Sequence, residues 1–191
     1  MIGKLTLGLY QTNIYILSND REAVVIDPGY EADTILDALE GRQLKAILLT
    51  HGHFDHVGAV KELVAETGCE VYIHPSETTL PPMITDGQLY YTHTYSEGDT
   101  VSPISGVELT VLHTPGHTPG SVCLLCEDAL FSGDTLFARS CGRTDLDGGD
   151  PEAMAASLKR LASFGNDYRV FPGHNSATTL ALEKEYNPFM R

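Results

Sequence analysis

The segment from Thr50 to His56, with the sequence THGHFDH, gathers three imidazoles and one carboxylate directly after the apolar run from Ala46 to Leu49. Spacings of two, two and one along an extended segment let four side chains converge on neighbouring points, as the ligands of zinc-type ions must. A polar surface turn with hydrated histidines is the alternative, but such a turn has no physical need for so many titratable groups. The segment therefore predicts a metal site, with the candidate ligands His51, His53, Asp55 and His56.

Further ligands are expected later in the chain, because four side chains on one turn cannot complete two coordination spheres. Three later segments each combine a strand-like run or a rigid loop with a histidine or an acid. They are LHTPGHTPGS from Leu112, FSGDT from Phe131 and VFPGH from Val170. Since each ligand segment follows a strand, the ligands can gather at one edge where strand ends meet.

Together these four segments resemble the metallo-β-lactamase superfamily, whose mark is a THxHxDH turn followed by a later His, a bridging Asp and a final His. The order matches throughout, from about residue 13 to the C-terminus. Within the superfamily the chain is similar to the glyoxalase II-like (hydroxyacylglutathione hydrolase-like) proteins. The segments that carry this likeness begin at Asn13 (NIY), Ile26 (IDPG), Thr114 (TPGHTPGS), Ser132 (SGDTLF), Gly142 (GRTD) and Pro172 (PGH).

The resemblance implies an α+β fold, the four-layer αββα sandwich, and a centre of two divalent metal ions. Zinc is the expected metal, with iron or manganese as alternatives. Asp134 would bridge the two ions, since a carboxylate has two oxygens to share, and each ion would keep an open position for water. Carried over position by position, the family pattern gives the first ion His51, His53 and His117, and the second Asp55, His56 and His174.

The implied reaction is hydrolysis by a metal-bound hydroxide, which attacks a carbonyl carbon while the metal ions stabilise the oxyanion. Asp55 and Asp134 are the expected catalytic carboxylates, with Asp55 orienting the nucleophile. Asp27 is expected next to the ligands, where it would orient a ligand imidazole by a hydrogen bond to the ring nitrogen that does not bind metal. Thiolates leave easily, so the implied substrate is a small-molecule thioester, either S-lactoylglutathione or a related hydroxyacyl thioester.

Other functions stay open. A persulfide dioxygenase shares the histidine-rich turn and the GRTD segment, but it uses a single iron, held here by His51 or His53 with His117 and Asp134. A hydrolase of another small ester or lactone would use the same centre. A non-catalytic metal module is disfavoured, because a structural site is closed by thiolates and needs no cluster of seven ligands. Since 191 − 174 = 17 residues follow the last ligand, the helical glutathione-binding domain of full glyoxalase II is expected to be missing.

Several other polar residues are expected outside the centre. His113 lies four residues before His117, but the family pattern places the ligand inside PGHTPG. His74 and His93 are expected to be structural or solvated. Arg143 could meet an anionic substrate or form an internal ion pair. The four cysteines are expected to be reduced, and the pair Cys123 and Cys126 lies in an apolar strand that points them to opposite faces.

Composition favours one domain over residues 1–191, because 42% hydrophobic residues can bury one sizeable core. The formal charge of 12 − 26 = −14 argues against nucleic acid or an anionic membrane as a partner. No apolar run approaches the roughly 18 residues of a membrane span, and no signal peptide is evident, so a cytoplasmic location is expected. The oligomeric state is not predicted.

Hydrophobic spacing predicts alternating strands and helices. Residues 14–17 and 23–26 predict a hairpin, and a tight turn is expected at 126–129 between two strands. The segment 79–95 has no clear period and is expected to form a surface loop over the cleft or a packed irregular connection. Helices are expected over residues 32–39, 57–67 (directly off the metal turn) and 151–161 (with Asp150 as N-cap).

Overall fold

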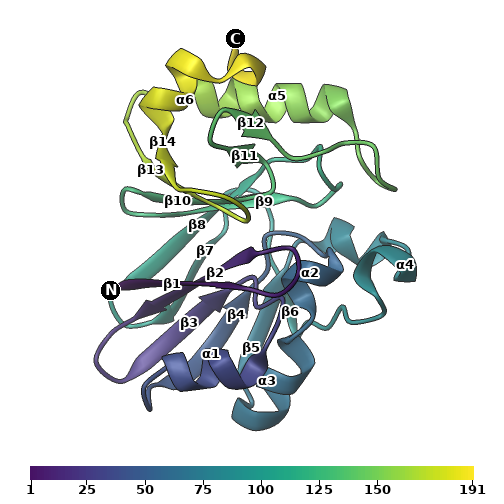
Figure 1. Cartoon of the computed structure of the whole chain (residues 1–191). Coiled ribbons are helices and arrows are strands. Elements are labelled where there is room, and N and C mark those ends of the chain that lie inside the picture. The colour runs from purple at the N-terminus through teal and green to yellow at the C-terminus, as the bar shows by residue number, and fades with distance from the viewer.

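Two mixed β-sheets, packed face to face, form the centre of the computed structural model, which describes residues 1–191 (Figure 1). Helices cover the outer face of each sheet, so the layers run helix, sheet, sheet, helix. The predicted αββα sandwich is therefore confirmed. No helix is both long and apolar enough to cross a membrane.

The N-terminal half of the chain forms the first sheet. In chain order its strands are β1 (Ile2–Leu7), β2 (Thr12–Ser18), β3 (Glu22–Ile26), β4 (Gln43–Leu48), β5 (Glu70–Ile73) and β6 (His93–Thr94). The first three are antiparallel, which confirms the predicted hairpin, and the later ones are parallel. Parallel neighbours need crossover connections, and the helices α1 (Ala32–Ala38) and α3 (Val60–Thr67) supply two of them on the outer face. The strand β1 was not predicted.

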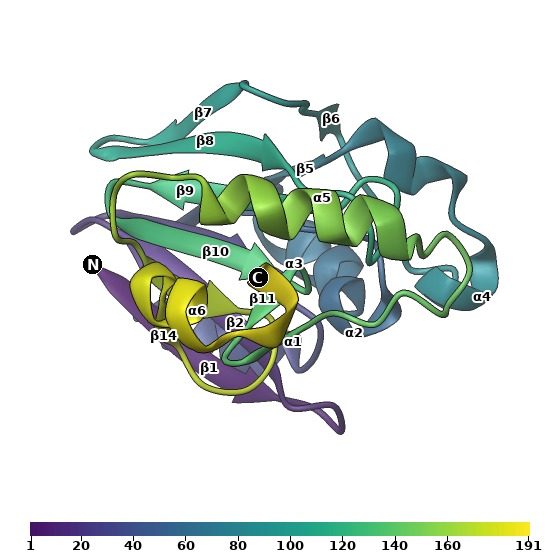
Figure 2. The ribbon, with the colours of Figure 1, turned by 90° about the horizontal axis from the view of Figure 1, so that it is seen from above.

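The C-terminal half forms the second sheet. Its strands are β7 (Thr100–Ile104), β8 (Val107–His113), β9 (Val122–Cys126), β10 (Ala129–Gly133), β13 (Arg169–Pro172) and β14 (Thr178–Thr179), and a separate ribbon pairs β11 (Leu136–Phe137) with β12 (Ser140–Cys141). Helices α5 (Pro151–Ala162) and α6 (Leu180–Tyr186) cover its outer face, as Figure 2 shows from above. Asp150 caps α5 as predicted, because its carboxylate accepts hydrogen bonds from the backbone N–H groups of the first turn.

Three hydrophobic layers hold these elements together. One lies between the first sheet and its helices, one between the two sheets, and one between the second sheet and its helices. Neighbouring residues of a central strand alternate between layers: Ile47 packs into the first and Leu48 into the second. Cys123 and Cys126 likewise pack on opposite faces of β9, and all four thiols are free, as predicted.

The prediction of one helix over residues 57–67 is wrong in detail. The segment instead forms two helices, α2 (Phe54–Val57) and α3, with a break between them. At this break, the turn that follows β3 packs against Gly58 and Ala59. Ala59 donates its N–H to Pro28 O at 3.0 Å, and a Cβ at Gly58 would lie 2.3 Å from the carbonyl oxygen of Gly29. The last two predicted ligands of the THGHFDH segment therefore lie on a short helical turn and not on an extended segment.

The segment 79–95 is more ordered than a surface loop. It contains α4 (Pro82–Thr85) and β6, and follows the 3₁₀ turn η1 (Pro75–Thr79). Its last tyrosine, Tyr95, is buried between the sheets and donates its hydroxyl to Leu49 O at 2.6 Å. Met83 and Ile84 of α4 line a cavity, so this part of the segment does border the cleft.

Candidate metal centre

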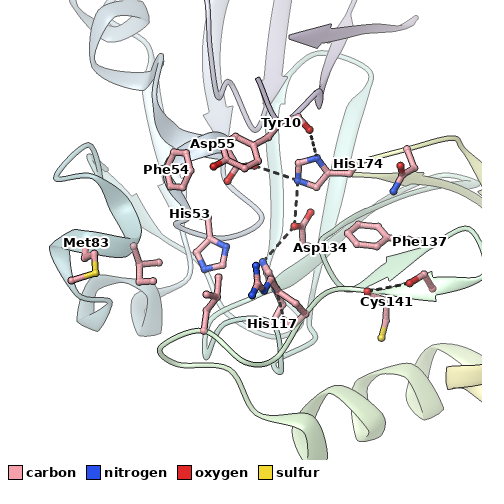
Figure 3. A pocket seen from close by; sticks show the side chains of 15 residues that line it. Tyr10, His53, Phe54, Asp55, Met83, His117, Asp134, Phe137, Cys141 and His174 are labelled. Atoms are coloured by element: carbon pink, nitrogen blue, oxygen red, sulfur yellow. Dashed lines mark hydrogen bonds and ion pairs between the residues drawn. The ribbon is translucent and has the colours of Figure 1, made fainter. Parts of the chain in front are cut away.

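Loops from four strand ends meet at one edge of the two sheets and carry the predicted ligand side chains. These loops follow β4, β8, β10 and β13. Figure 3 shows side chains from all four converging on one space. The expectation that the ligand segments gather where strand ends meet is confirmed.

The predicted ligands form two groups of three. In each group, one nitrogen or oxygen atom of every member lies within 4.8 Å of the others. The groups are His51, His53 and His117, and Asp55, His56 and His174. A further grouping joins Asp27 to His51 and His56. The structure thus brings the side chains together in the two sets that the resemblance implied, while their roles as ligands stay a prediction.

Asp134 lies between the two groups. Its Oδ2 is 3.4 Å from Nε2 of both His117 and His174, which belong to different groups, and its Oδ1 is 3.5 Å from Nε2 of His56. Gly173 makes this approach possible, because a Cβ there would lie 2.3 Å from Asp134 Oδ1. The position suits a carboxylate that shares its oxygens between two cations.

Four buried polar atoms of the cluster have no hydrogen-bond partner. They are Nε2 of His51, His53 and His117, and Oδ1 of Asp134. An unpaired buried polar atom costs about 1–3 kcal/mol, so several at one place require an explanation such as a bound ion. Imidazole nitrogens and carboxylate oxygens are ligands of zinc-type ions, and this donor set therefore fits a metal centre.

Asp27 orients two of the predicted ligands through hydrogen bonds. Its carboxylate accepts hydrogen bonds from the Thr50 backbone N–H at 2.7 Å and the Thr50 hydroxyl at 2.6 Å, and lies 3.0 Å from His56 Nδ1. The Thr50 hydroxyl gives its proton to Asp27, so it can accept the Nδ1 proton of His51, which lies 3.1 Å away. Asp27 therefore orients two imidazoles, directly and through Thr50, with each Nε2 directed to the centre.

Two further imidazoles are fixed by backbone carbonyls. His117 Nδ1 lies 2.7 Å from Arg143 O, and His174 Nδ1 lies 3.1 Å from Tyr10 O. A carbonyl oxygen only accepts, so Nδ1 of each ring carries a proton, and Nε2 is the nitrogen that can offer a lone pair to a metal ion. This is the tautomer that a metal ligand needs at Nε2.

The sequence pattern of the metallo-β-lactamase superfamily matches residues 7–174, which include the whole cluster. The chain belongs to this superfamily. A relative from Bacillus subtilis, named "Probable metallo-hydrolase YqgX", is 35% identical over 98% of this chain and 96% of its own length. A relative from Haemophilus influenzae, the hydroxyacylglutathione hydrolase GloC, is 34% identical over 95% of this chain and 93% of its own length.

Two solved structures are similar over nearly all of both chains. The B3 metallo-β-lactamase BLEG-1 has a TM-score of 0.90 at 37% identity and covers 100% of this chain and 99% of its own. TTHA1623, in a di-iron-bound form, has a TM-score of 0.87 at 41% identity and covers 98% of this chain and 99% of its own. Family membership and the grouped ligands make the chain a metallo-hydrolase with a His/Asp metal site.

The two groups of this metallo-β-lactamase centre differ in charge. Burial lowers the pKa of His53 to about 3, and burial with neighbouring imidazoles also lowers that of His51. Burial acts the same way on His56 and His174, but nearby carboxylates outweigh it and raise their pKa values to about 9 and about 10. The first group therefore offers neutral nitrogens, and the second lies in a field that attracts positive charge.

Glu77 is a site residue that the sequence did not reveal. This buried glutamate of η1 accepts a hydrogen bond from Gly52 N at 2.6 Å through Oε2 and from Gly120 N at 2.7 Å through Oε1. Gly52 lies between two predicted ligand histidines of the first loop, and Gly120 belongs to the PGHTPG loop. Glu77 therefore ties two ligand loops together, over sequence separations of 25 and 43 residues.

The strand β2 supplies two further contacts that were not predicted. The Thr12 hydroxyl donates to Asp55 Oδ2 at 3.2 Å. The Asn13 side chain donates to Pro172 O at 2.9 Å and to Asn175 O at 2.8 Å, on either side of His174. The NIY segment, singled out by resemblance alone, thus holds the loop that carries the last predicted ligand, His174.

The histidines expected outside the centre do lie outside it. His113 directs Nε2 to Pro119 O at 2.9 Å and stacks on His74, with 4.2 Å between ring centroids. His93 stacks on Tyr72. Arg143 pairs with Asp145 through two hydrogen bonds of 2.7 Å and 2.9 Å, which is the internal ion pair considered above.

Proposed function

We propose that the chain is a dinuclear metal-dependent thioesterase of glyoxalase II type, acting on S-lactoylglutathione or a related hydroxyacyl thioester. The observation that carries this proposal is the pairing of two ligand groups around Asp134, with unpaired buried nitrogens directed to one place at the floor of a cavity. The hydroxyacylglutathione hydrolase activity named for the Haemophilus influenzae relative supports the choice of substrate.

We further propose that His51, His53 and His117 hold one ion, that Asp55, His56 and His174 hold the other, and that Asp134 bridges them. A single-iron site would use one group only. It would leave the other group, whose nitrogen and oxygen atoms also lie within 4.8 Å of one another, without an ion. Two ions are also named for a similar chain, the di-iron form of TTHA1623, although zinc remains the expected metal for this nitrogen and oxygen donor set.

The bound ions would supply a Lewis-acid centre, at which water ionises near neutral pH and a carbonyl oxygen is polarised. The protein's own groups orient the reactants. Thr12 fixes Asp55, because its hydroxyl donates to Asp55 Oδ2 at 3.2 Å. Its carboxylate borders the cavity, where it is placed to accept a hydrogen bond from the attacking water. A thiolate leaves without strong general-acid help, so a thioester needs no further proton donor.

Thiol release from S-lactoylglutathione, followed with a chromogenic thiol reagent, tests the proposed function. Protein loaded with metal should release thiol, and a chelator should abolish the reaction. A panel of coenzyme A thioesters, lactones, phosphodiesters and a β-lactam belongs in the same experiment. Protein that cleaves no thioester but opens a lactone or a β-lactam would keep the hydrolytic centre and contradict the thioesterase.

A further inference from the structure

The cavity above the metal centre has a polar floor and apolar walls. It encloses about 640 Å³, and its floor is formed by ligand side chains. Phe54, Met83 and Tyr10 line one side, and Phe137 lies on the other, beyond Asp134 (Figure 3). A substrate whose carbonyl group lies on the floor must therefore place the rest of its atoms against apolar side chains.

The apolar wall is exposed at the mouth of the cavity. Met83 of α4 has 85% of its surface exposed and Tyr10, in the turn between β1 and β2, has 55%. The Tyr10 ring packs edge-on against Phe54, with 5.4 Å between ring centroids. These three residues come from separate segments, and all of them line the cavity. Apolar surface grouped at the entrance of a reactive site is typical of a ligand-binding surface.

The cavity lining has few positively charged groups that could bind the carboxylates of a substrate. Apart from the imidazoles of the floor, Arg143 is its one basic lining residue. The guanidinium of Arg143 already makes two hydrogen bonds to the Asp145 carboxylate, so its charge is paired. The chain as a whole carries 26 acidic and 12 basic side chains. The two free carboxylates of a glutathione group would find no unpaired cation among the side chains that line the cavity walls.

We infer that the cavity selects thioesters whose thiol part is apolar and uncharged, such as a benzyl or short alkyl thiol, over the thioester of glutathione. This inference rests on the proposed thioesterase function. The thiol part is larger than a lactoyl group, so it is the part that reaches the wall formed by Tyr10, Phe54 and Met83. In the reaction, the water oxygen bonds to the carbonyl carbon and the C–S bond breaks. The electron pair leaves with sulfur, and the products are a carboxylate, a thiol and a proton.

Two substrates with the same acyl group and the same reacting bond test the inference: S-lactoylglutathione and the lactoyl thioester of benzyl mercaptan. For the wild-type protein we expect kcat/KM to be at least about 10-fold higher for the benzyl thioester, which is the discrimination that a few buried methylene groups provide. Met83→Ser should reduce this ratio and Met83→Leu should keep it. Leu182→Ser is the matched control, since Leu182 is an exposed apolar residue of α6 that does not line the cavity.

A binding measurement separates failure of this inference from failure of the proposed function. Calorimetry would compare two unreactive thioethers, a benzyl thioether of a lactate analogue and S-methylglutathione. Tighter binding of the benzyl compound, weakened by Met83→Ser, supports the inference whether or not thioesters are cleaved. Equal or tighter binding of S-methylglutathione, or a kcat/KM ratio that Met83→Ser leaves unchanged, overturns it. Absence of thioester cleavage, with benzyl binding intact, would overturn only the thioesterase.

Discussion

At the floor of the cavity the imidazoles are buried and backed by fixed partners, whereas at its mouth Met83 and Tyr10 expose most of their surfaces to solvent. The floor relies on hydrogen bonds between distant segments, such as those that Asp27 and Glu77 accept. At the mouth, the Tyr10 ring in the turn between β1 and β2 packs against the Phe54 ring of α2. One region is rigidly specified by its contacts and the other is not.

This difference between floor and mouth suggests that the two regions have different tasks, the reaction at the floor and the choice of substrate at the mouth. A buried group that loses its partner costs about 1–3 kcal/mol, so the residues of the floor are mutually dependent and a change in one affects the others. An exposed apolar side chain at the mouth can change with little effect on its neighbours. The superfamily chemistry therefore resides in the floor, and the choice of substrate in the wall.

The largest loss is expected from Asp134→Asn, which removes the negative charge between the two ligand groups. An amide cannot offer two anionic oxygens to two cations. Turnover should therefore fall by more than the roughly 10–100-fold loss that is typical when a residue hydrogen-bonded to a metal ligand is replaced. Steady-state kinetics at saturating metal, with circular dichroism as the check on folding, measures this. Activity within a few-fold of wild type in a folded variant would exclude a bridging role.

A smaller loss is expected from Glu77→Gln, which acts on the ligand loops without touching the reactants. Both carboxylate oxygens of Glu77 accept backbone N–H groups, and an amide would direct its own donor at one of them. Metal affinity, measured by competition with a chromogenic chelator, should weaken about 10–100-fold. Glu66→Gln on the exposed face of α3 is the matched control. Equal metal affinities for the two variants would show that Glu77 does not position the loops.

His113→Ala should change turnover far less than Asp134→Asn, since His113 contacts Pro119 and His74 but no predicted ligand. We expect less than about a 10-fold change, below the range for residues that orient ligands directly. Kinetics of both variants under identical metal loading makes the comparison. Equal losses in two well-folded variants would mean that the ligand assignment around His117 is wrong.

The smallest effect is expected from Glu97→Gln, at a surface ion pair outside the floor. Hydrogen bonding to Arg160 lowers the pKa of Glu97 below its usual 4.5, so the folded protein favours the carboxylate. Its contribution is therefore present above pH 4.5 and is lost as the pH falls through the lowered pKa. Urea unfolding should show a loss of less than about 1 kcal/mol at neutral pH, because the pair is partly exposed. A difference from wild type that grows as the pH falls would contradict this.

The predicted ligands come from short motifs that follow strands, and such local patterns can be found in a sequence. Asp27 was predicted from the IDPG segment, which the family resemblance singled out and which directly follows β3. Glu77 and Thr12 were missed because their partners lie 25 to 43 residues away and only tertiary packing brings them together. The break at Gly58 likewise depends on contact with Gly29, which helical periodicity alone does not show.

The central claim, that these side chains hold two metal ions, is tested most directly by elemental analysis of protein purified without a chelator. The account predicts about two transition-metal ions per chain, as zinc, iron or manganese, because seven ligand side chains exceed what one ion needs. A reproducible single iron per chain, with oxygen consumed on addition of glutathione persulfide, would contradict it and would favour the persulfide dioxygenase.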